Sequence, residues 1–149
     1  MELRDAEMRD AQQLDRMLGR LIREESRYDG NLRRDCHIQN NYCDRIGMDG
    51  HKLILIEDCG EILGYLYGFV YHVPGIYKSP IGIVDALFVE EKHRRKGYAS
   101  MLISAFREFA TENGACRIEL KVVSDNEPAV ALYKKLSFTE TRKYMKLGL

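Results

Sequence analysis

The sequence predicts a mixed α/β (α+β) domain arranged around one central sheet. The apolar residues follow a helical period over the first 45 residues and a strand-like period from about residue 51 to 89. Beyond residue 97, helical and strand-like segments alternate. A length of 149 residues is typical of one domain, so residues 1–149 are expected to form a single domain.

The N-terminal part is predicted to hold a short strand at Leu3 followed by two helices. Five apolar residues have the i, i+3, i+4, i+7, i+8 spacing of one helix face: Leu14, Met17, Leu18, Leu21 and Ile22. A second, weaker helix is expected from about Asn31 to Arg45, because Gly30 and Gly47 bound that segment.

Three strands are expected to follow. His51–Glu57 and Ile62–Val73 are separated by the turn residues 58–61. After a loop bracketed by Pro74 and Pro80, Ile81–Val89 is so uniformly apolar that we expect a central strand buried on both faces.

Helical spacing returns after Gly97. The predicted buried stripe consists of Ala99, Leu102, Ile103, Phe106 and Ala110. Asn113-Gly114 ends this helix with residues that tolerate a left-handed backbone. We then expect a strand at 116–123, a short helix at Glu127–Leu136 and a last strand at Phe138–Leu147.

The composition excludes several function classes. Lys plus Arg number 23 and Asp plus Glu number 23, so the formal charge is zero, which argues against a protein that coats nucleic acid or an acidic membrane. No apolar run approaches the ~18 residues of a membrane span. The N-terminus lacks the apolar core of a secretory signal, and four dispersed cysteines form no metal or disulfide pattern. A cytoplasmic location with free thiols is therefore expected, and no metal site.

The segment from Val89 to Ala99 is the most informative stretch. An apolar strand runs into a loop that carries basic side chains, then into Gly97 and a helix. The start of a helix offers free N–H groups and partial positive charge, which suits a phosphate. The nucleotide P-loop and the G-x-G-x-x-G pattern are both absent. The remaining alternatives are a solvated basic turn and a nucleic-acid patch, of which the second lacks interleaved aromatic residues.

Two motifs resemble the GNAT superfamily of N-acetyltransferases. Arg94-x-x-Gly97-x-Ala99 is similar to the acyl-CoA-binding signature of that superfamily. Residues 126–138, NEPAVALYKKLSF, resemble its second motif, N-x-x-A-x-x-L-Y-x-x-x-G-F. This sequence has Ser137 where the motif has glycine, at a position that often needs a left-handed backbone.

The resemblance implies a GNAT-like twisted, mostly antiparallel sheet that splays between its fourth and fifth strands and is flanked by about four helices. It implies an acetyl-CoA-dependent N-acetyltransferase with CoA as a product. The main chain of Leu87, Phe88 and Val89 would bind the pantetheine arm of acetyl-CoA. The loop residues Arg94, Arg95, Lys96, Gly97, Tyr98 and Ala99 would hold its pyrophosphate, and Asn126 would lie near the arm. Asn126 is equally natural as a helix N-cap.

Two residues are the catalytic candidates that the resemblance implies. Tyr133 would be the general acid that protonates the CoA thiolate, although its spacing alone is also that of a core residue. Asp85 would be the base that deprotonates the amine. It lies two residues before Leu87, which predicts that both share one face of the strand. The alternative for Asp85 is a structural carboxylate bonded to backbone.

The acceptor is expected to be a primary amine of a small molecule (a polyamine, an aminoglycoside or an amino-acid derivative) or of a peptide. Acidic and aromatic residues in the regions that would line its pocket are Glu25, Tyr28, Asp29, Asp35, Tyr42, Tyr71, His72 and Tyr77. A non-catalytic acyl-CoA-binding sensor or interaction module is the alternative function. Neither a nucleic acid nor a membrane is an expected partner. The resemblance leaves a homodimer open, because GNAT proteins are often dimers, but nothing in the sequence determines the oligomeric state.

Overall fold

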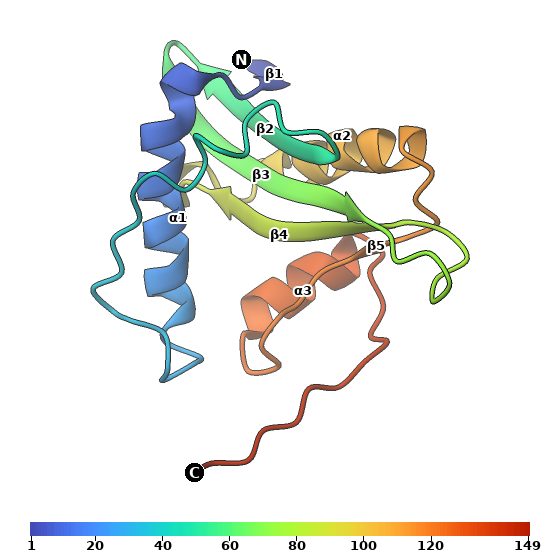
Figure 1. Ribbon diagram of the computed structural model, residues 1–149. Coiled ribbons are helices and arrows are strands. Elements are labelled where there is room, and N and C mark those ends of the chain that lie inside the picture. Colours follow the sequence, from blue (N-terminus) through green and yellow to red (C-terminus); the bar gives the residue numbers. More distant parts are fainter.

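The structure is a computed structural model that describes residues 1–149. Its centre is a five-stranded sheet in the order β1-β2-β3-β4-β5. The strands span Glu2–Asp5 (β1), His51–Asp58 (β2), Glu61–Tyr71 (β3), Ile81–Val89 (β4) and Ile118–Glu119 (β5). The α-helices span Ala11–Glu25 (α1), Tyr98–Glu112 (α2) and Glu127–Lys135 (α3), and short 3-10 turns occur at Met8–Asp10 and Glu91–His93. The mixed α+β fold class is confirmed (Figure 1).

The strands pair very unequally. β1 to β4 form a continuous antiparallel meander, whereas β4 and β5 are parallel and pair only at Gly82↔Ile118 and Ile83↔Glu119. Beyond Ile83, therefore, β4 has no strand on its outer side. This is the opening between the fourth and fifth strands that the resemblance implied.

Helices α1 and α2 cover opposite faces of the sheet (Figure 1). The core on the α1 face consists of Leu14, Met17, Tyr42, Leu53, Leu55, Ile62, Tyr65, Tyr67, Ala86 and Phe88. The core on the α2 face includes Ile54, Ile56, Leu66, Val84, Leu102, Ile103, Phe106 and Ala110. Each predicted helix stripe faces one of these cores, and β4 contributes to both, as its uniformly apolar sequence predicted.

A β-bulge interrupts β4 where it pairs with β3. Tyr67 pairs with Ala86 and Gly68 pairs with Val84, so Asp85 is the extra residue. An extra residue reverses the alternation of side chains between the two faces. Ala86 accordingly lies in the α1-face core, whereas Leu87 packs against the α2-face core.

The helix predicted between Asn31 and Arg45 is wrong, because this segment forms only turns and irregular backbone. Tertiary hydrogen bonds fix it in place: the Asp15 carboxylate accepts from the backbone N–H groups of Asn41 and Tyr42. The Tyr42 side chain is fully buried in the α1-face core. The sheet is therefore flanked by three α-helices and not by four.

The C-terminal predictions also need correction. The strand expected at 116–123 is regular only at Ile118–Glu119, and residues 138–147 form no strand. By contrast, β4 has the predicted bounds and α2 and α3 agree within one residue. No helix has the length and apolar character that a membrane crossing requires.

Candidate active site

The loop between β4 and α2 has the backbone of an anion site. Gly97 immediately precedes the first residue of α2 and has a φ of 85°, which a residue with a side chain rarely adopts. No side chain caps the first turn of α2. A Cβ built on Gly97 would have no atom within 4 Å, so the space in front of the helix start is open. The free N–H groups and partial positive charge of this helix start suit a phosphate.

The basic side chains of this loop divide into two groups. Lys92 is bound to Glu61 at 2.5 Å, and the Arg94 guanidinium donates to both carboxylate oxygens of Glu24 at 2.9 Å. Arg95 and Lys96 form no ion pair with a carboxylate, so their charges are available to a ligand. Of the predicted phosphate-binding side chains, Arg94 is thus already engaged in joining the loop to the end of α1.

At the end of β4, a ligand could reach the main chain more easily than the side chains. Phe88 is 2% exposed, and the guanidinium groups of Arg20 and Arg94 lie 5.3 and 5.7 Å from its ring centroid. Leu87 and Val89 are half-buried against the α2-face core. Because no β5 residue pairs with β4 beyond Ile83, main-chain groups on the outer side of β4 up to Phe88 remain open to an extended ligand, whereas the Val89 carbonyl accepts a hydrogen bond from Arg94 Nε at 2.9 Å. Their binding of pantetheine stays a prediction.

Asp85 is an exposed carboxylate that makes no hydrogen bond or ion pair, so the structural alternative for this residue is not supported. The prediction that it shares a face with Leu87 is wrong. The bulge turns Asp85 toward the α1 face, where its charge contributes to raising the pKa values of Tyr42, Tyr65 and Tyr67.

Glu25, the last residue of α1, lies near enough to Asp85 for the two negative charges to interact. Partial burial raises the pKa of the Glu25 carboxyl, and the negative charges of Asp85 and Glu24 raise it further. The Glu25 carboxylate has no hydrogen-bond or salt-bridge partner. Two carboxylates that are both unpaired, one from a helix end and one from a strand bulge, therefore share this part of the α1 face.

Tyr133 of α3 completes the cluster. Burial and then the Glu25 charge raise the pKa of the Tyr133 phenol to about 12. Its hydroxyl makes no hydrogen bond, and its ring packs edge-on against Phe138 at 5.9 Å. The phenol is therefore held by packing while its proton remains free to be donated.

Asn126 is the N-cap of α3, because its side-chain oxygen accepts from the Ala129 N–H at 3.3 Å. Ser137 has a φ of 69°, so the left-handed backbone expected there is confirmed. The same turn places Phe138 against Tyr133. Both motif positions thus serve to fix the ends of the helix that carries Tyr133.

The expected acceptor-pocket residues are only partly brought together. Tyr42 is buried beneath the carboxylates, and its hydroxyl hydrogen-bonds to that of Tyr65. Asp35 is instead paired with Arg33 at the surface. Tyr71, His72 and Tyr77 form a separate cluster at the β3–β4 loop, where His72 contacts the Tyr77 carbonyl. Sequence spacing could not identify Glu25 as the partner of Asp85, since the two are 60 residues apart.

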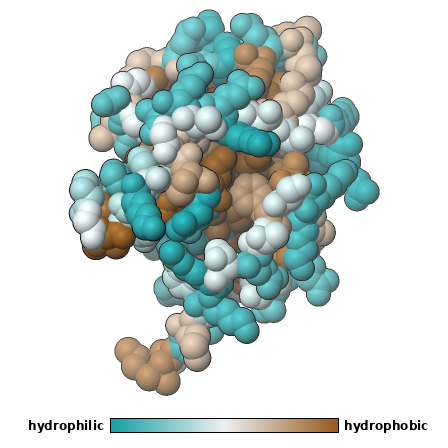
Figure 2. Space-filling view, turned by 90° about the vertical axis from the view of Figure 1, so that its right-hand side faces the viewer, coloured by the Kyte–Doolittle hydropathy of each residue, from teal (hydrophilic) through white to brown (hydrophobic).

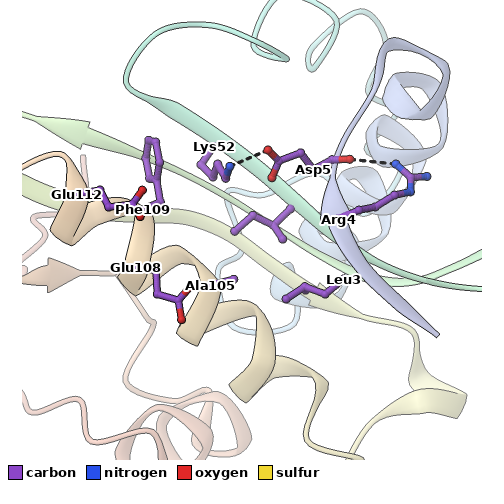
Figure 3. Close-up of a pocket in the computed structure, with 9 residues that line it drawn as sticks. Leu3, Arg4, Asp5, Lys52, Ala105, Glu108, Phe109 and Glu112 are labelled. Carbon is purple, nitrogen blue, oxygen red and sulfur yellow. Dashed lines mark hydrogen bonds and ion pairs between the residues drawn. The ribbon is translucent and has the colours of Figure 1, made fainter.

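A pocket of about 190 Å³ lies on the other face of the sheet, between β1, β2 and α2 (Figure 3). Its lysine is already engaged: Lys52 bonds to Asp5 at 2.7 Å and lies over the Phe109 ring. Ligand pockets usually enclose about 300–1,000 Å³. This pocket is thus smaller than a substrate site and lies away from Asp85 and Tyr133.

The family and the relatives that comparison with known proteins identifies are acetyltransferases. The profile of the acetyltransferase (GNAT) family matches residues 15–138. An aminoglycoside N(6')-acetyltransferase type 1 of Acinetobacter haemolyticus is 32% identical over 72 residues, which are 48% of this chain and 50% of that protein. An N-alpha-acetyltransferase of Saccharolobus solfataricus is 33% identical over 90 residues, 55% of this chain and 53% of that protein. The matches span about half of these two relatives.

Solved structures share the fold over the whole chain. A mutant protein from Bacillus halodurans has a TM-score of 0.88 at 18% identity, covering 100% of this chain and 99% of that one. An aminoglycoside N-acetyltransferase in complex with CoA has a TM-score of 0.73 at 19% identity, covering 99% and 98%. With the family profile matching most of the sequence, this chain belongs to the GNAT family of acetyltransferases.

Proposed function

We propose that this protein transfers the acetyl group of acetyl-CoA to a primary amine of a small cationic molecule. The observation that carries the proposal is the convergence of three unpaired groups from three elements: Glu25 of α1, Asp85 of β4 and Tyr133 of α3. The Glu24–Arg94 ion pair docks the end of α1 onto the β4–α2 loop, so these groups lie beside the anion site.

The loop fits the pyrophosphate of acetyl-CoA. Gly97 gives open access to the uncapped start of α2, and Arg95 and Lys96 carry charges that no carboxylate neutralises. Acetyl-CoA supplies an activated thioester, so the protein need not form a covalent intermediate of its own. A nucleic-acid role is less suited to this loop, because Glu61 and Glu24 neutralise two of its cations.

Asp85 has the right placement to receive the proton of the acceptor ammonium, directly or through water. An alkylamine with a pKa near 10.4 is neutral in about one molecule per 2,500 at pH 7, a handicap of roughly 4.6 kcal/mol. The unpaired carboxylates bind the cation first, which relieves their mutual repulsion. Proton acceptance by Asp85 then leaves a neutral amine held in the site.

Tyr133 holds the proton required by the leaving sulfur. A phenol pKa of about 12 keeps it protonated throughout the physiological range. A thiol has a pKa near 8.5, so full proton transfer from Tyr133 would cost roughly 5 kcal/mol, where an ordinary phenol would cost about 2 kcal/mol. We therefore expect the Tyr133 hydroxyl to donate a strong hydrogen bond to the developing thiolate, with transfer completed as CoA leaves.

The acceptor inferred from the site carries more than one positive charge. Glu25 and Asp85 would each contact an ammonium. The names of the relatives include aminoglycoside acetyltransferases and an N-alpha-acetyltransferase, so aminoglycosides and peptide N-termini are both relevant candidates. Two neighbouring carboxylates without partners favour the small polycation.

A panel of amines with detection of free thiol released from acetyl-CoA tests the function. The panel contains an aminoglycoside, a linear polyamine, an amino-acid amide and an uncharged peptide with a free N-terminus. We expect the highest kcat/KM for one of the first two. A preference for the uncharged peptide would contradict the small polycation, and CoA binding without turnover of any amine would favour the sensor alternative.

Two variants separate the cofactor site from the acceptor site. Gly97→Val should abolish CoA binding measured by calorimetry, because a β-branched residue disfavours a φ of 85° and its side chain fills the approach to α2. Glu25→Gln should raise KM for the amine and leave CoA affinity unchanged. If Gly97→Val binds CoA as the wild type does, the loop is not the pyrophosphate site.

A further inference from the structure

Two ion pairs connect the end of α1 with the residues that follow β4. Arg20 donates to Glu90 at 2.7 Å, and Arg94 donates to both carboxylate oxygens of Glu24 at 2.9 Å. Hydrophilic side chains cover much of the surface, as Figure 2 shows for one face, and ion pairs on such a surface usually contribute little to stability. These two pairs are different in kind, because each of them joins two elements that meet at the proposed active site.

The two pairs hold one side of α1. Arg20 and Glu24 are four residues apart, so they lie one turn apart on the same side of the helix. Their charges are opposite, and so are those of Glu90 and Arg94, so a shift of α1 by one turn would bring like charges together. Both guanidinium groups also lie over the Phe88 ring, which includes β4 in the same contact. The position and the rotation of α1 are thus fixed at this point.

The last turn of α1 carries two carboxylates where a helix favours cations. The C-terminus of a helix has a partial negative charge, so Glu24 and Glu25 are both unfavourable there. Arg23 of the same turn donates to the Cys36 carbonyl, and Arg94 adds a second positive charge from outside the helix. The Glu25 carboxylate has no partner of its own, so its direction depends on how its neighbour Glu24 is held.

We propose that Glu24 and Arg94 are positioning residues for the amine acceptor. Their ion pair holds the end of α1 so that Glu25 can bind a second ammonium group of the acceptor while Asp85 binds the first. This inference rests on the proposed function, since it concerns the same site. Arg94 acts on the acceptor through Glu24, to which it is bound across 70 residues of sequence.

The consequence for acceptor choice is selective. An acceptor with two ammonium groups uses both carboxylates, whereas a monoamine uses Asp85 alone. Displacement of Glu25 therefore weakens the binding of the first kind of acceptor only. Because the second ammonium group takes no part in the reaction, the loss should appear in KM and not in kcat.

The test compares the polycation that the wild type turns over best with its analogue lacking the second amino group, at saturating acetyl-CoA. Glu24→Gln and Arg94→Gln should each raise KM for the polycation about 10-fold, the value expected for one lost charged hydrogen bond. KM for the analogue should change less than about 2-fold. Glu24→Gln should leave CoA affinity unchanged in calorimetry and lower the melting temperature by no more than about 4 °C.

The direction of the change separates positioning from a general charge effect. Glu24→Gln removes a negative charge and Arg94→Gln removes a positive one, so a simple attraction of cations would change in opposite directions. Positioning predicts that KM rises in both variants. The double variant should lose no more than either single variant, because both remove the same bond. Combined with Glu25→Gln, the change Glu24→Gln should have no further effect.

Glu61→Gln is the matched control. It breaks the Lys92–Glu61 ion pair, which belongs to the same loop and involves no α1 residue, so KM for the polycation should not change. A wild-type KM in Glu24→Gln overturns the positioning role, and so does an equal loss for the polycation and its analogue. A fall of KM in Arg94→Gln also overturns it. A wild type that prefers no polycation contradicts the proposed function itself, and the positioning role then fails with it.

Discussion

Two parts of this molecule differ strongly in how extensively they are paired and buried. The sheet from β1 to β4 is a continuous meander, and β3 and β4 alone pair at eight positions. The part from β5 to the C-terminus pairs with the rest of the sheet at two positions and contains no fully buried helix residue. The first part carries the β4–α2 loop, and the second supplies Tyr133 from a helix that has no fully buried residue.

The proposed active site lies across this boundary. Asp85 belongs to the well-paired part and owes its direction to a bulge in β4. Tyr133 belongs to the loosely held part and owes its place to packing against Phe138. The difference indicates that the proposed base and the proposed anion site are positioned by the sheet, whereas the proposed proton donor depends on how α3 is held.

The largest expected effect is that of Asp85→Asn. Removing the charge with the shape retained should lower kcat/KM about 1,000-fold, or roughly 4 kcal/mol, because a positioned base contributes about that much. Thermal stability should not fall, since Asp85 makes no hydrogen bond. Steady-state kinetics with the best amine and a melting curve check this; wild-type kinetics would remove Asp85 from the mechanism.

Gly68→Ala tests the well-paired part. A Cβ at this position would lie 2.6 Å from the Ile83 carbonyl oxygen and from the buried Phe106 ring, beside the bulge. We expect a loss of about 3 kcal/mol in the free energy of unfolding, measured in urea. Gly30→Ala is the matched control, because nothing lies within 4 Å of its Cβ, and it should change stability by less than about 0.5 kcal/mol.

Tyr133→Phe tests the loosely held part. Loss of the hydroxyl should lower kcat about 30-fold, or roughly 2 kcal/mol, with CoA affinity and stability nearly unchanged, since that hydroxyl has no partner in the chain. Tyr144→Phe removes an exposed hydroxyl and serves as the control for kinetics. Equal kcat values for wild type and Tyr133→Phe would assign the proton donor to another group.

Ser137→Gly should strengthen the same region. A φ of 69° costs serine about 1–2 kcal/mol, part of which is offset by the greater chain entropy of glycine in the unfolded state. We expect a net stabilisation of about 1 kcal/mol in urea melts. Ser137→Ala keeps the strained φ and should give no gain, so equal stabilities of the glycine and alanine variants would contradict the strain argument.

The smallest effect is a pH dependence that Glu25 introduces. Its pKa in the folded protein is raised by burial and by Asp85, so the native state favours the protonated carboxyl. This contribution to stability is fully present below the ordinary pKa of 4.5 and is lost as the pH rises through the folded-state value. Glu25→Gln should therefore be more stable than wild type at neutral pH, with the difference vanishing in acid. A difference independent of pH would mean that Glu25 is not perturbed.

Much of the framework was predictable because its causes are local. The apolar run of β4, the helical stripe of α2 and the glycine before it determined these elements and the backbone of the candidate anion site. The left-handed position of Ser137 followed from the motif in the same way. By contrast, residues 31–45 are irregular because Asp15 and the buried Tyr42 hold them, and both interactions are long-range.

The sequence by itself determined the family and indicated the candidate anion site at the β4–α2 loop and the two catalytic candidates, since each was inferred from residues adjacent in the chain. Only the tertiary structure decided which face Asp85 takes, because a bulge depends on the register between two strands. The same holds for Glu25, which reaches Asp85 and Tyr133 only when α1, β4 and α3 are packed together. Residues 138–147 have the sequence of a strand, but a strand forms only where a second strand offers its hydrogen bonds, and the chain leaves that edge unfilled.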